Sequence, residues 1–209
     1  MVSGATKTLK KFKGHPHLGF LVTPRAANRA EFAITHGMPW AADNSAYSCW
    51  DEGRFRRMLD RIAGVPGCLW VAARDVVADA AATLELFDAW QPRIAARGLP
   101  IALVAQDGLE DLDVPWDRLD ALFLGGSTGW KLSDQARRLC VEAKARGKLL
   151  HMGRVNSRRR LLLAAGWGCD TVDGSCFSRW PDTKIPRALR WISEAEAMTP
   201  EGERGWVTR

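Results

Sequence analysis

Seven short apolar runs recur along this chain, and longer amphipathic or polar stretches separate them. The runs are GFLVTP (19–24), PWAADNS (39–45), CLWVAARD (68–75), IALVAQD (101–107), ALFLGGS (121–127), KLLHMGRV (148–155) and CDTVDGS (169–175). Runs of this length between helix-like segments are typical of strands buried in a parallel sheet. Because strands that alternate with helices form right-handed βαβ units, the pattern predicts an α/β fold.

The stretches between the runs predict helices, and several of them end in glycine, as a helix C-terminus commonly does. They are AANRAEFAITHG (26–37), DEGRFRRMLDRIAG (51–64), DAAATLELFDAWQPRIAARG (79–98), SDQARRLCVEAKARG (133–147) and SRRRLLLAAGWG (157–168). The linker 109–120 is more irregular. We expect a basic arm over residues 1–18 and a C-terminal helix with a polar tail over 188–209, within one domain that spans 1–209.

Polar residues or glycines stand at the C-terminal end of nearly every apolar run. In a TIM-type (β/α)8 barrel these ends meet on one face, where active sites are built. In an open doubly wound sheet, only the ends near the switch point meet. The number of polar strand ends favours a (β/α)8 barrel, complete or abbreviated, with the open sheet as the alternative.

Composition narrows the class of protein. Hydrophobic residues make up 46% of the 209 residues and charged residues 26%, as in an ordinary globular protein. No apolar run is long enough to cross a bilayer, and the basic N-terminus lacks the apolar core of a secretory signal. We therefore expect a cytoplasmic protein without membrane contact. Five scattered cysteines form no Cys-x-x-Cys pair, which argues against a structural zinc site.

The net charge is +6, and the positive residues cluster in segments such as KTLKKFK and GRVNSRRR. Such clusters hold polyanions by releasing counterions, although a solvated basic surface gives the same pattern.

Three aspartates at strand ends are candidates for chemistry: Asp43, Asp75 and Asp173. A carboxylate beside a substrate acts as nucleophile or general base, and paired carboxylates carry out displacement at an anomeric carbon. The alternative is that each aspartate caps the helix that follows it.

Five segments, in order, resemble the motifs of tRNA-guanine transglycosylases. ADNSAYS (42–48) resembles the family's Asp-Ser-Gly-Gly-Phe-Gln segment, and LVAQDG (103–108) its Val-Gln-Gly segment. FLGGST (123–128) resembles Gly-Gly-Leu, and LLHMGRV (149–155) resembles Leu-Met-Gly-Val-Gly. GCDTVDGSCFSR (168–179) is similar to the Gly-hydrophobic-Asp-Met-Phe-Asp-Cys run with its following arginine.

The chain also departs from those enzymes, because it lacks their zinc subdomain and has Asn-Ser-Ala-Tyr at 44–47 in place of Ser-Gly-Gly-Phe. A compact form without the zinc module looks more like the DpdA-type DNA-guanine transglycosylases of phages and bacteria. The resemblance implies exchange of guanine in DNA for a 7-deazaguanine such as 7-cyano-7-deazaguanine. It implies no cofactor and no metal. It leaves a partner subunit or a homo-oligomer open.

The resemblance also implies roles for individual residues. Asp173 matches the nucleophile that forms a covalent glycosyl-enzyme, and Asp43 matches the general acid/base. The residues that would contact the base are Asp75, Gln106, Gly125, Gly126, Tyr47, Met152 and Gly153. The residues that would bind the phosphates of the nucleic-acid backbone are Arg154, Arg158, Arg159, Arg179, Lys184 and Lys131. His151 lies inside an apolar run, and we interpret it as an oriented pocket or core histidine rather than a metal ligand.

The sequence is also compatible with other functions. The same carboxylates would suit exchange in tRNA, N-glycosidic hydrolysis or deoxyribosyl transfer. A fourth alternative is a nucleic-acid-binding barrel that serves as a partner subunit without catalysis.

Overall fold

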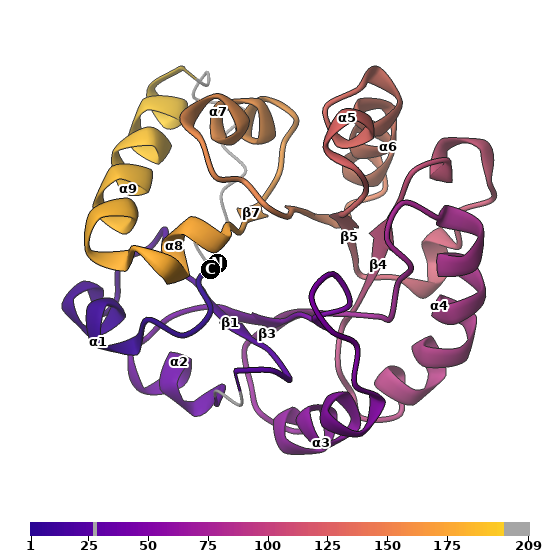
Figure 1. Cartoon of the computed structure of the whole chain (residues 1–209), viewed down its shortest axis with the longest axis horizontal. Helices are drawn as coiled ribbons and strands as arrows, with labels where there is room; N and C mark the ends of the chain where they lie inside the picture. Colours follow the sequence, from indigo (N-terminus) through magenta and orange to yellow (C-terminus); the bar gives the residue numbers. More distant parts are fainter. Residues whose placement is uncertain (27–28, 199–209) are drawn as a thin grey trace.

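A computed structural model describes residues 1–26 and 29–198. Within these residues, seven parallel strands form one sheet in chain order, and the sheet curves into an abbreviated TIM-type barrel (Figure 1). The strands are β1 (Phe20–Val22), β2 (Trp40–Ala42), β3 (Cys68–Ala72), β4 (Ile101–Ala105), β5 (Ala121–Leu124), β6 (Leu149–Met152) and β7 (Thr171–Val172). Each strand lies inside one of the seven apolar runs, so the predicted fold class is confirmed.

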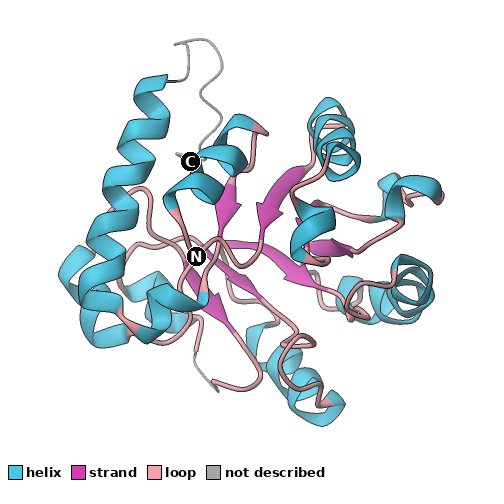
Figure 2. Ribbon diagram, turned by 45° about the horizontal axis from the view of Figure 1, so that its top comes forward, coloured by secondary structure: helices cyan, strands magenta, loops and turns pink. Residues whose placement is uncertain are grey.

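Helices surround the outside of this sheet, as Figures 1 and 2 show. The α-helices are α1 (Thr6–Leu9), α2 (Glu31–Thr35), α3 (Glu52–Ile62), α4 (Ala80–Ala95), α5 (Thr128–Lys131), α6 (Asp134–Ala145), α7 (Arg158–Gly166), α8 (Ser175–Arg179) and α9 (Pro181–Met198). Short 3-10 turns are η1 (Lys10–Phe12), η2 (Leu109–Asp111) and η3 (Trp116–Arg118). Aspartate or serine side chains cap the N-termini of α3, α4, α5, α6 and α7, which satisfies backbone N–H groups that the helix itself leaves free.

The strands bury both of their faces. Side chains on the outer face pack against the helices in a large apolar core. Side chains on the inner face fill the barrel interior, where alanines stand beside two large rings, those of Trp70 and Phe123. The inner set is Leu21, Ala41, Trp70, Ala72, Ala102, Val104, Ala121 and Phe123. A barrel filled by side chains has a solid floor, so an open site can form only beyond the strand ends.

The first residues of the chain lie between β1 and β7 (Figure 1). Val2 forms a parallel bridge with Phe20, and the amino group of Met1 donates a hydrogen bond to the carbonyl of Val172. This segment takes the place that an eighth strand would have. Val2 and Leu9 are buried, whereas Lys7, Lys10, Lys11 and Lys13 are exposed, so the basic segment is packed against the barrel with its lysines at the surface.

The C-terminal helix starts earlier than expected, because α9 begins at Pro181 and contains Pro186. Its buried residues, Ile185, Ala188, Ile192 and Ala195, recur at helical spacing and face the core. The polar tail predicted beyond this helix lies outside the described residues. Across residues 1–26 and 29–198, no helix combines the length and apolar character needed to cross a bilayer.

Candidate active site

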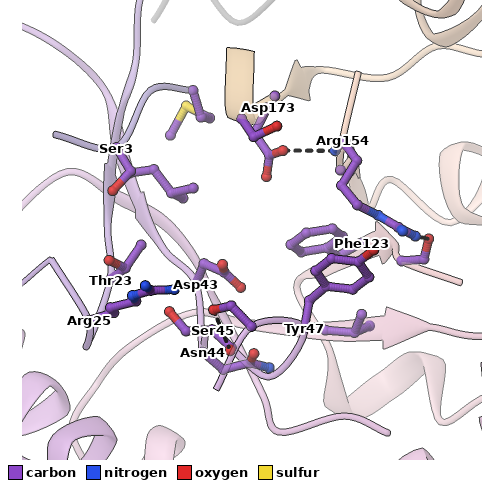
Figure 3. A pocket seen from close by; sticks show the side chains of 18 of the residues that line it. Ser3, Thr23, Arg25, Asp43, Asn44, Ser45, Tyr47, Phe123, Arg154 and Asp173 are labelled. Carbon is purple, nitrogen blue, oxygen red and sulfur yellow. Dashed lines mark hydrogen bonds between the residues drawn. The ribbon is translucent and has the colours of Figure 1, made fainter. Parts of the chain in front are cut away.

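A cavity of about 520 Å³ opens at the C-terminal ends of the strands (Figure 3). Every β-strand contributes to its wall through the last strand residues or the loop that follows. Leu21, Val104 and Phe123 form apolar parts of the wall. The predicted site residues on the wall are Asp43, Asp75, Gln106, Gly125, Gly126, Tyr47, Gly153, Arg154 and Asp173.

Asp173 follows β7, and hydrogen bonds hold both of its carboxylate oxygens. Oδ1 accepts from the backbone N–H of Arg154 at 2.8 Å, and Oδ2 lies 3.4 Å from Nε2 of His151. Burial on its own would raise the pKa of Asp173. The contacts with His151 and with the backbone of Arg154 outweigh it, and the pKa lies below its ordinary value. Asp173 is therefore ionised at neutral pH, with its side chain still 17% exposed.

Asp43 follows β2 and lies across the cavity from Asp173 (Figure 3). Burial, and then the negative charges of Asp173 and Asp75, raise the pKa of Asp43 from 3.8 to about 7. Backbone N–H groups of Asn44 and Ser45 moderate this rise. A substantial fraction of Asp43 is therefore protonated at neutral pH, so it can act as an acid opposite the ionised Asp173, in a cavity whose third carboxyl group is that of Asp75.

Two positions with a strained backbone lie next to these two acids. In the described part of the chain, four residues other than glycine have a positive φ. Ser45 (φ 63°) follows the Asp43 strand end, and Arg154 (φ 60°) presents its N–H to Asp173. Ala78 (φ 62°) donates its N–H to Oε1 of Gln106 at 2.8 Å. Such conformations cost about 1–3 kcal/mol each and cluster at functional sites.

Asp75 and Gln106 belong to one hydrogen-bonded network. Nδ2 of Asn44 donates to Oδ1 of Asp75 at 2.8 Å, and Nε2 of Gln106 donates to Oδ2 at 2.6 Å. Oε1 of Gln106 accepts from the N–H groups of Ala78 and Gly126. Gln106 thus keeps a single amide hydrogen for a ligand, so its main effect is to fix Asp75. Burial raises the pKa of Asp75.

The predicted glycines are required by packing. A Cβ at Gly125 would lie 2.6 Å from Val104, and one at Gly153 would lie 2.6 Å from the ring of Phe123. Gly126 has φ +48°, and a Cβ there would lie 2.4 Å from the ring of Trp130. Their absent side chains let the β5 and β6 loops approach the strands below the cavity.

Tyr47 and Arg154 meet at the cavity wall (Figure 3). The guanidinium of Arg154 lies 4.5 Å from the centre of the Tyr47 ring and also donates to the carbonyls of Gly125 and Gly126. Tyr47 is 67% exposed, so its ring is accessible to a ligand as well as to solvent.

Two predicted residues lie elsewhere than expected. Met152 is buried in the core between the sheet and the helices, because alternate residues of β6 point to opposite faces, and it does not line the cavity. Lys131 is 1% exposed and donates to the carbonyl of Gly153 at 2.7 Å. Burial lowers the pKa of Lys131 to about 7. The prediction that Lys131 grips phosphates is wrong, because its ammonium group supports the β6 loop from inside.

Of the other predicted phosphate contacts, Arg154 lies on the cavity wall in the loop after β6, and the rest lie on α7, α8 and α9, outside the wall. Arg158 is paired with Glu194, with 2.6 Å between Nε and Oε2. Arg179 lies over the ring of Trp180. Arg159 is exposed and Lys184 half-buried.

Sequence reasoning missed two residues that shape this site, Arg25 and Asn44, and it missed the contact of Asp173 with His151, which it interprets as an oriented pocket or core histidine. Arg25 lies on the cavity wall and comes from the loop after β1. Asn44 binds Asp75, and its position directly after Asp43 was the available signal. His151 lies inside the barrel and contacts Asp173, which no local pattern indicates. Among residues 1–26 and 29–198, no three His, Cys, Asp or Glu side chains are grouped to hold a metal ion.

Solved structures share this fold at low sequence identity. A mutant mandelate oxidase with a monooxide FMN adduct superposes with a TM-score of 0.61 at 15% identity, covering 97% of this chain and 70% of that one. A mandelate oxidase with (S)-2-phenylpropionate gives 0.61 at 15% identity, with 96% and 69% covered. The HpcH/HpaI aldolase of Desulfitobacterium hafniense DCB-2 gives 0.52 at 14% identity, with 96% and 92% covered.

These similarities establish a TIM-barrel-like fold and nothing beyond it. No protein-family model matches the chain. No curated protein matches it either.

Proposed function

We propose that this protein is a base-exchange transglycosylase that replaces guanine in DNA with a 7-deazaguanine through a covalent glycosyl-aspartate. The observation that carries the proposal is the pair of carboxyl groups across one cavity, Asp43 and Asp173, whose pKa values are shifted in opposite directions. Carboxyl pairs with separated pKa values divide the acid and nucleophile roles of displacement reactions.

In the first displacement, a carboxylate oxygen of Asp173 attacks C1′ of the nucleotide, and the bond from C1′ to N9 of guanine breaks. Protonated Asp43 gives its proton to the departing base. Asp173 then carries the sugar as an ester, and Asp43 is ionised. An anionic nucleophile suits this step because positive charge develops on the sugar.

In the second displacement, Asp43 takes the N9 proton of the incoming 7-deazaguanine. N9 attacks C1′, and the ester bond to Asp173 breaks. Asp43 is protonated again and Asp173 is ionised, so both groups return to their starting states. Two inversions at C1′ retain the configuration of the nucleotide.

The cavity wall suits a purine. Leu21, Val104 and Phe123 offer apolar surface to the faces of a planar base. Asp75, held by Asn44 and Gln106, offers acceptor oxygens to ring N–H and amino groups. A guanine inside a duplex must leave the base stack to reach such a cavity. The net charge of +6 favours a nucleic acid as the carrier of the base.

The experiment is mass spectrometry of nucleosides from DNA incubated with the protein and 7-cyano-7-deazaguanine. Wild-type protein is expected to insert the deazaguanine, whereas Asp173→Asn inserts none. Asp113→Asn is the matched control, because Asp113 is exposed and lies outside the cavity wall. Insertion by Asp173→Asn at the wild-type rate contradicts the proposal.

Parallel incubations distinguish base exchange in DNA from the alternative functions. Labelled guanine enters DNA if the enzyme exchanges bases, whereas hydrolysis leaves abasic sites. Insertion into tRNA but not DNA would change the substrate and keep the mechanism. Tight DNA binding without any exchange would favour a non-catalytic binding subunit.

A further inference from the structure

His151 lies inside the barrel directly beneath the candidate nucleophile. It belongs to β6, where it is paired in register with Thr171 of β7. Its side chain is fully buried, and its ring lies 4.6 Å from that of Trp70 and 4.4 Å from that of Phe123, centre to centre. His151 does not line the cavity, so it cannot touch a substrate there. Any effect on the reaction must pass through Asp173.

Both ring nitrogens of His151 have a partner. Nδ1 lies 2.8 Å from the hydroxyl oxygen of Thr171, and Nε2 lies 3.4 Å from Oδ2 of Asp173. An ionised carboxylate only accepts hydrogen bonds, so Nε2 must carry the hydrogen in that contact. A neutral imidazole then has a lone pair on Nδ1, which accepts from the hydroxyl of Thr171. The carboxylate therefore selects the Nε2–H tautomer, and the hydroxyl of Thr171 stabilises it by donating to Nδ1.

The charged groups that act on His151 are Asp173, the amino group of Met1 and Lys131. Burial lowers the pKa of His151, and it outweighs the opposing effect of Asp173. The ring is therefore neutral at neutral pH. A neutral donor orients Asp173 without the strong ion pairing that would make the carboxylate a poorer nucleophile.

We propose that His151 is a positioning residue for Asp173, and that Thr171 stabilises the Nε2–H tautomer, which the carboxylate selects, by donating its hydroxyl hydrogen to Nδ1. The inference rests on the proposed function in one respect, the role of Asp173 as nucleophile. His151 restrains Oδ2 while the backbone N–H of Arg154 restrains Oδ1. With both oxygens restrained, the plane of the carboxylate is fixed toward the cavity.

The tautomer can be measured without any activity. Nitrogen-15 NMR of histidine-labelled protein distinguishes an Nε2–H from an Nδ1–H ring, and His151→Gln identifies the signal by its loss. The expected wild-type signal is that of a neutral Nε2–H tautomer. Thr171→Val, which keeps the side-chain shape without the hydroxyl, shifts the signal toward Nδ1–H, whereas Thr171→Ser does not. An Nδ1–H ring in the wild type would overturn the proposal.

The effect on the reaction is measured as the pH dependence of base exchange. His151→Leu is expected to lower the rate about ten- to hundred-fold, which is the change in rate that corresponds to the free energy of a hydrogen bond to a charged group. It also moves the acid limb of the profile to higher pH, because Asp173 loses a donor. His151→Gln offers an amide N–H in place of Nε2–H and should restore most of the rate and the acid limb.

Thermal unfolding of each variant separates this effect from loss of folding. If His151→Leu does not fold, Thr171→Val is used instead. We expect Thr171→Val to move the acid limb of the pH profile to higher pH as well, by a smaller amount. An unchanged limb in a folded variant overturns the proposal. If wild-type protein shows no exchange, the pKa of Asp173 is followed by carboxyl carbon-13 NMR. A rise in Thr171→Val and none in Thr171→Ser then supports the positioning role, even though the proposed reaction has failed.

Discussion

At the scale of residues, Asp43 and Asp173 lie in one cavity and have opposite pKa shifts for local reasons. Asp173 accepts from the N–H of Arg154 and contacts Nε2 of His151. Asp43 is buried beside two other carboxylates, Asp173 and Asp75, which makes its ionisation costly. Identical side chains thus have pKa values shifted in opposite directions because of their surroundings, and the proposed reaction uses this difference.

The pH dependence of exchange follows from the pKa of Asp43. Its acid form is lost as pH rises through about 7, so the rate of guanine departure should fall above that pH. Asp43→Asn cannot donate a proton, so we expect about 100-fold slower exchange at neutral pH, a typical loss for general acid catalysis, and no fall near pH 7. Steady-state rates between pH 5 and pH 9 measure both. A wild-type profile in Asp43→Asn would contradict the assignment.

The same shift affects stability. The pKa of Asp43 is about 7 in the folded protein against an ordinary value of 3.8 in the unfolded chain, so the folded state binds more protons between these values. Stability therefore falls as pH rises through this window, by up to about 4 kcal/mol. Asp43→Asn removes that contribution, so the variant should gain stability relative to wild type as pH rises from 4 to 8. Urea unfolding at several pH values tests the sign, and a constant difference would contradict it.

At the scale of elements, the turn from β5 to α5 depends on a glycine that two constraints fix. Gly126 has φ +48°, and an added Cβ would lie 2.4 Å from Trp130 and 2.8 Å from Asp107. Gly126→Ala should cost about 2–5 kcal/mol of unfolding free energy through strain and overpacking. Gly129→Ala, three residues on, meets open space within α5 and should be neutral or stabilising by up to about 1 kcal/mol. Equal effects in urea unfolding would refute this account of the turn.

Strand positions were predictable because each strand lies in a short, mostly apolar run that is followed by a polar residue or glycine. β3, for example, lies inside CLWVAARD with Asp75 just beyond its end. The direction of side chains at the last strand residues was not predictable in the same way. Met152 and His151 are neighbours on β6, and a shift of one position exchanges the core face for the barrel face. The sequence alone favours neither assignment in a run that is apolar on both sides.

At the scale of the whole molecule, the parts that escaped prediction are contacts between segments far apart in the chain. Val2 forms a parallel bridge with Phe20 of β1, and the ammonium group of Lys131 donates a hydrogen bond to the carbonyl of Gly153. Neither contact has a local signature in the sequence. For Lys131, a positive charge near a glycine-rich loop predicts phosphate binding as readily as it predicts a buried hydrogen bond. The candidate site as a set of strand ends was predictable. The hydrogen bonds that tune it were not.

Binding to DNA should weaken steeply with salt, since the molecule carries a net charge of +6. Arg25 lies on the cavity wall, so Arg25→Gln should lower the slope of log affinity against log salt concentration by about 1. Arg158 is already paired with Glu194, so Arg158→Gln should leave the slope unchanged. Fluorescence anisotropy with a short labelled duplex at several salt concentrations measures both slopes. A larger change in Arg158→Gln would reverse this assignment.

The central claim is that Asp173 forms a covalent bond to the sugar of its substrate. Intact-protein mass spectrometry after denaturing quench, with guanine-containing DNA and no incoming base, tests it most directly. We predict a species with the mass of protein plus DNA minus guanine, joined at Asp173 and absent in Asp173→Asn. Base exchange that proceeds in Asp173→Asn, or an adduct joined at another residue, would contradict the account.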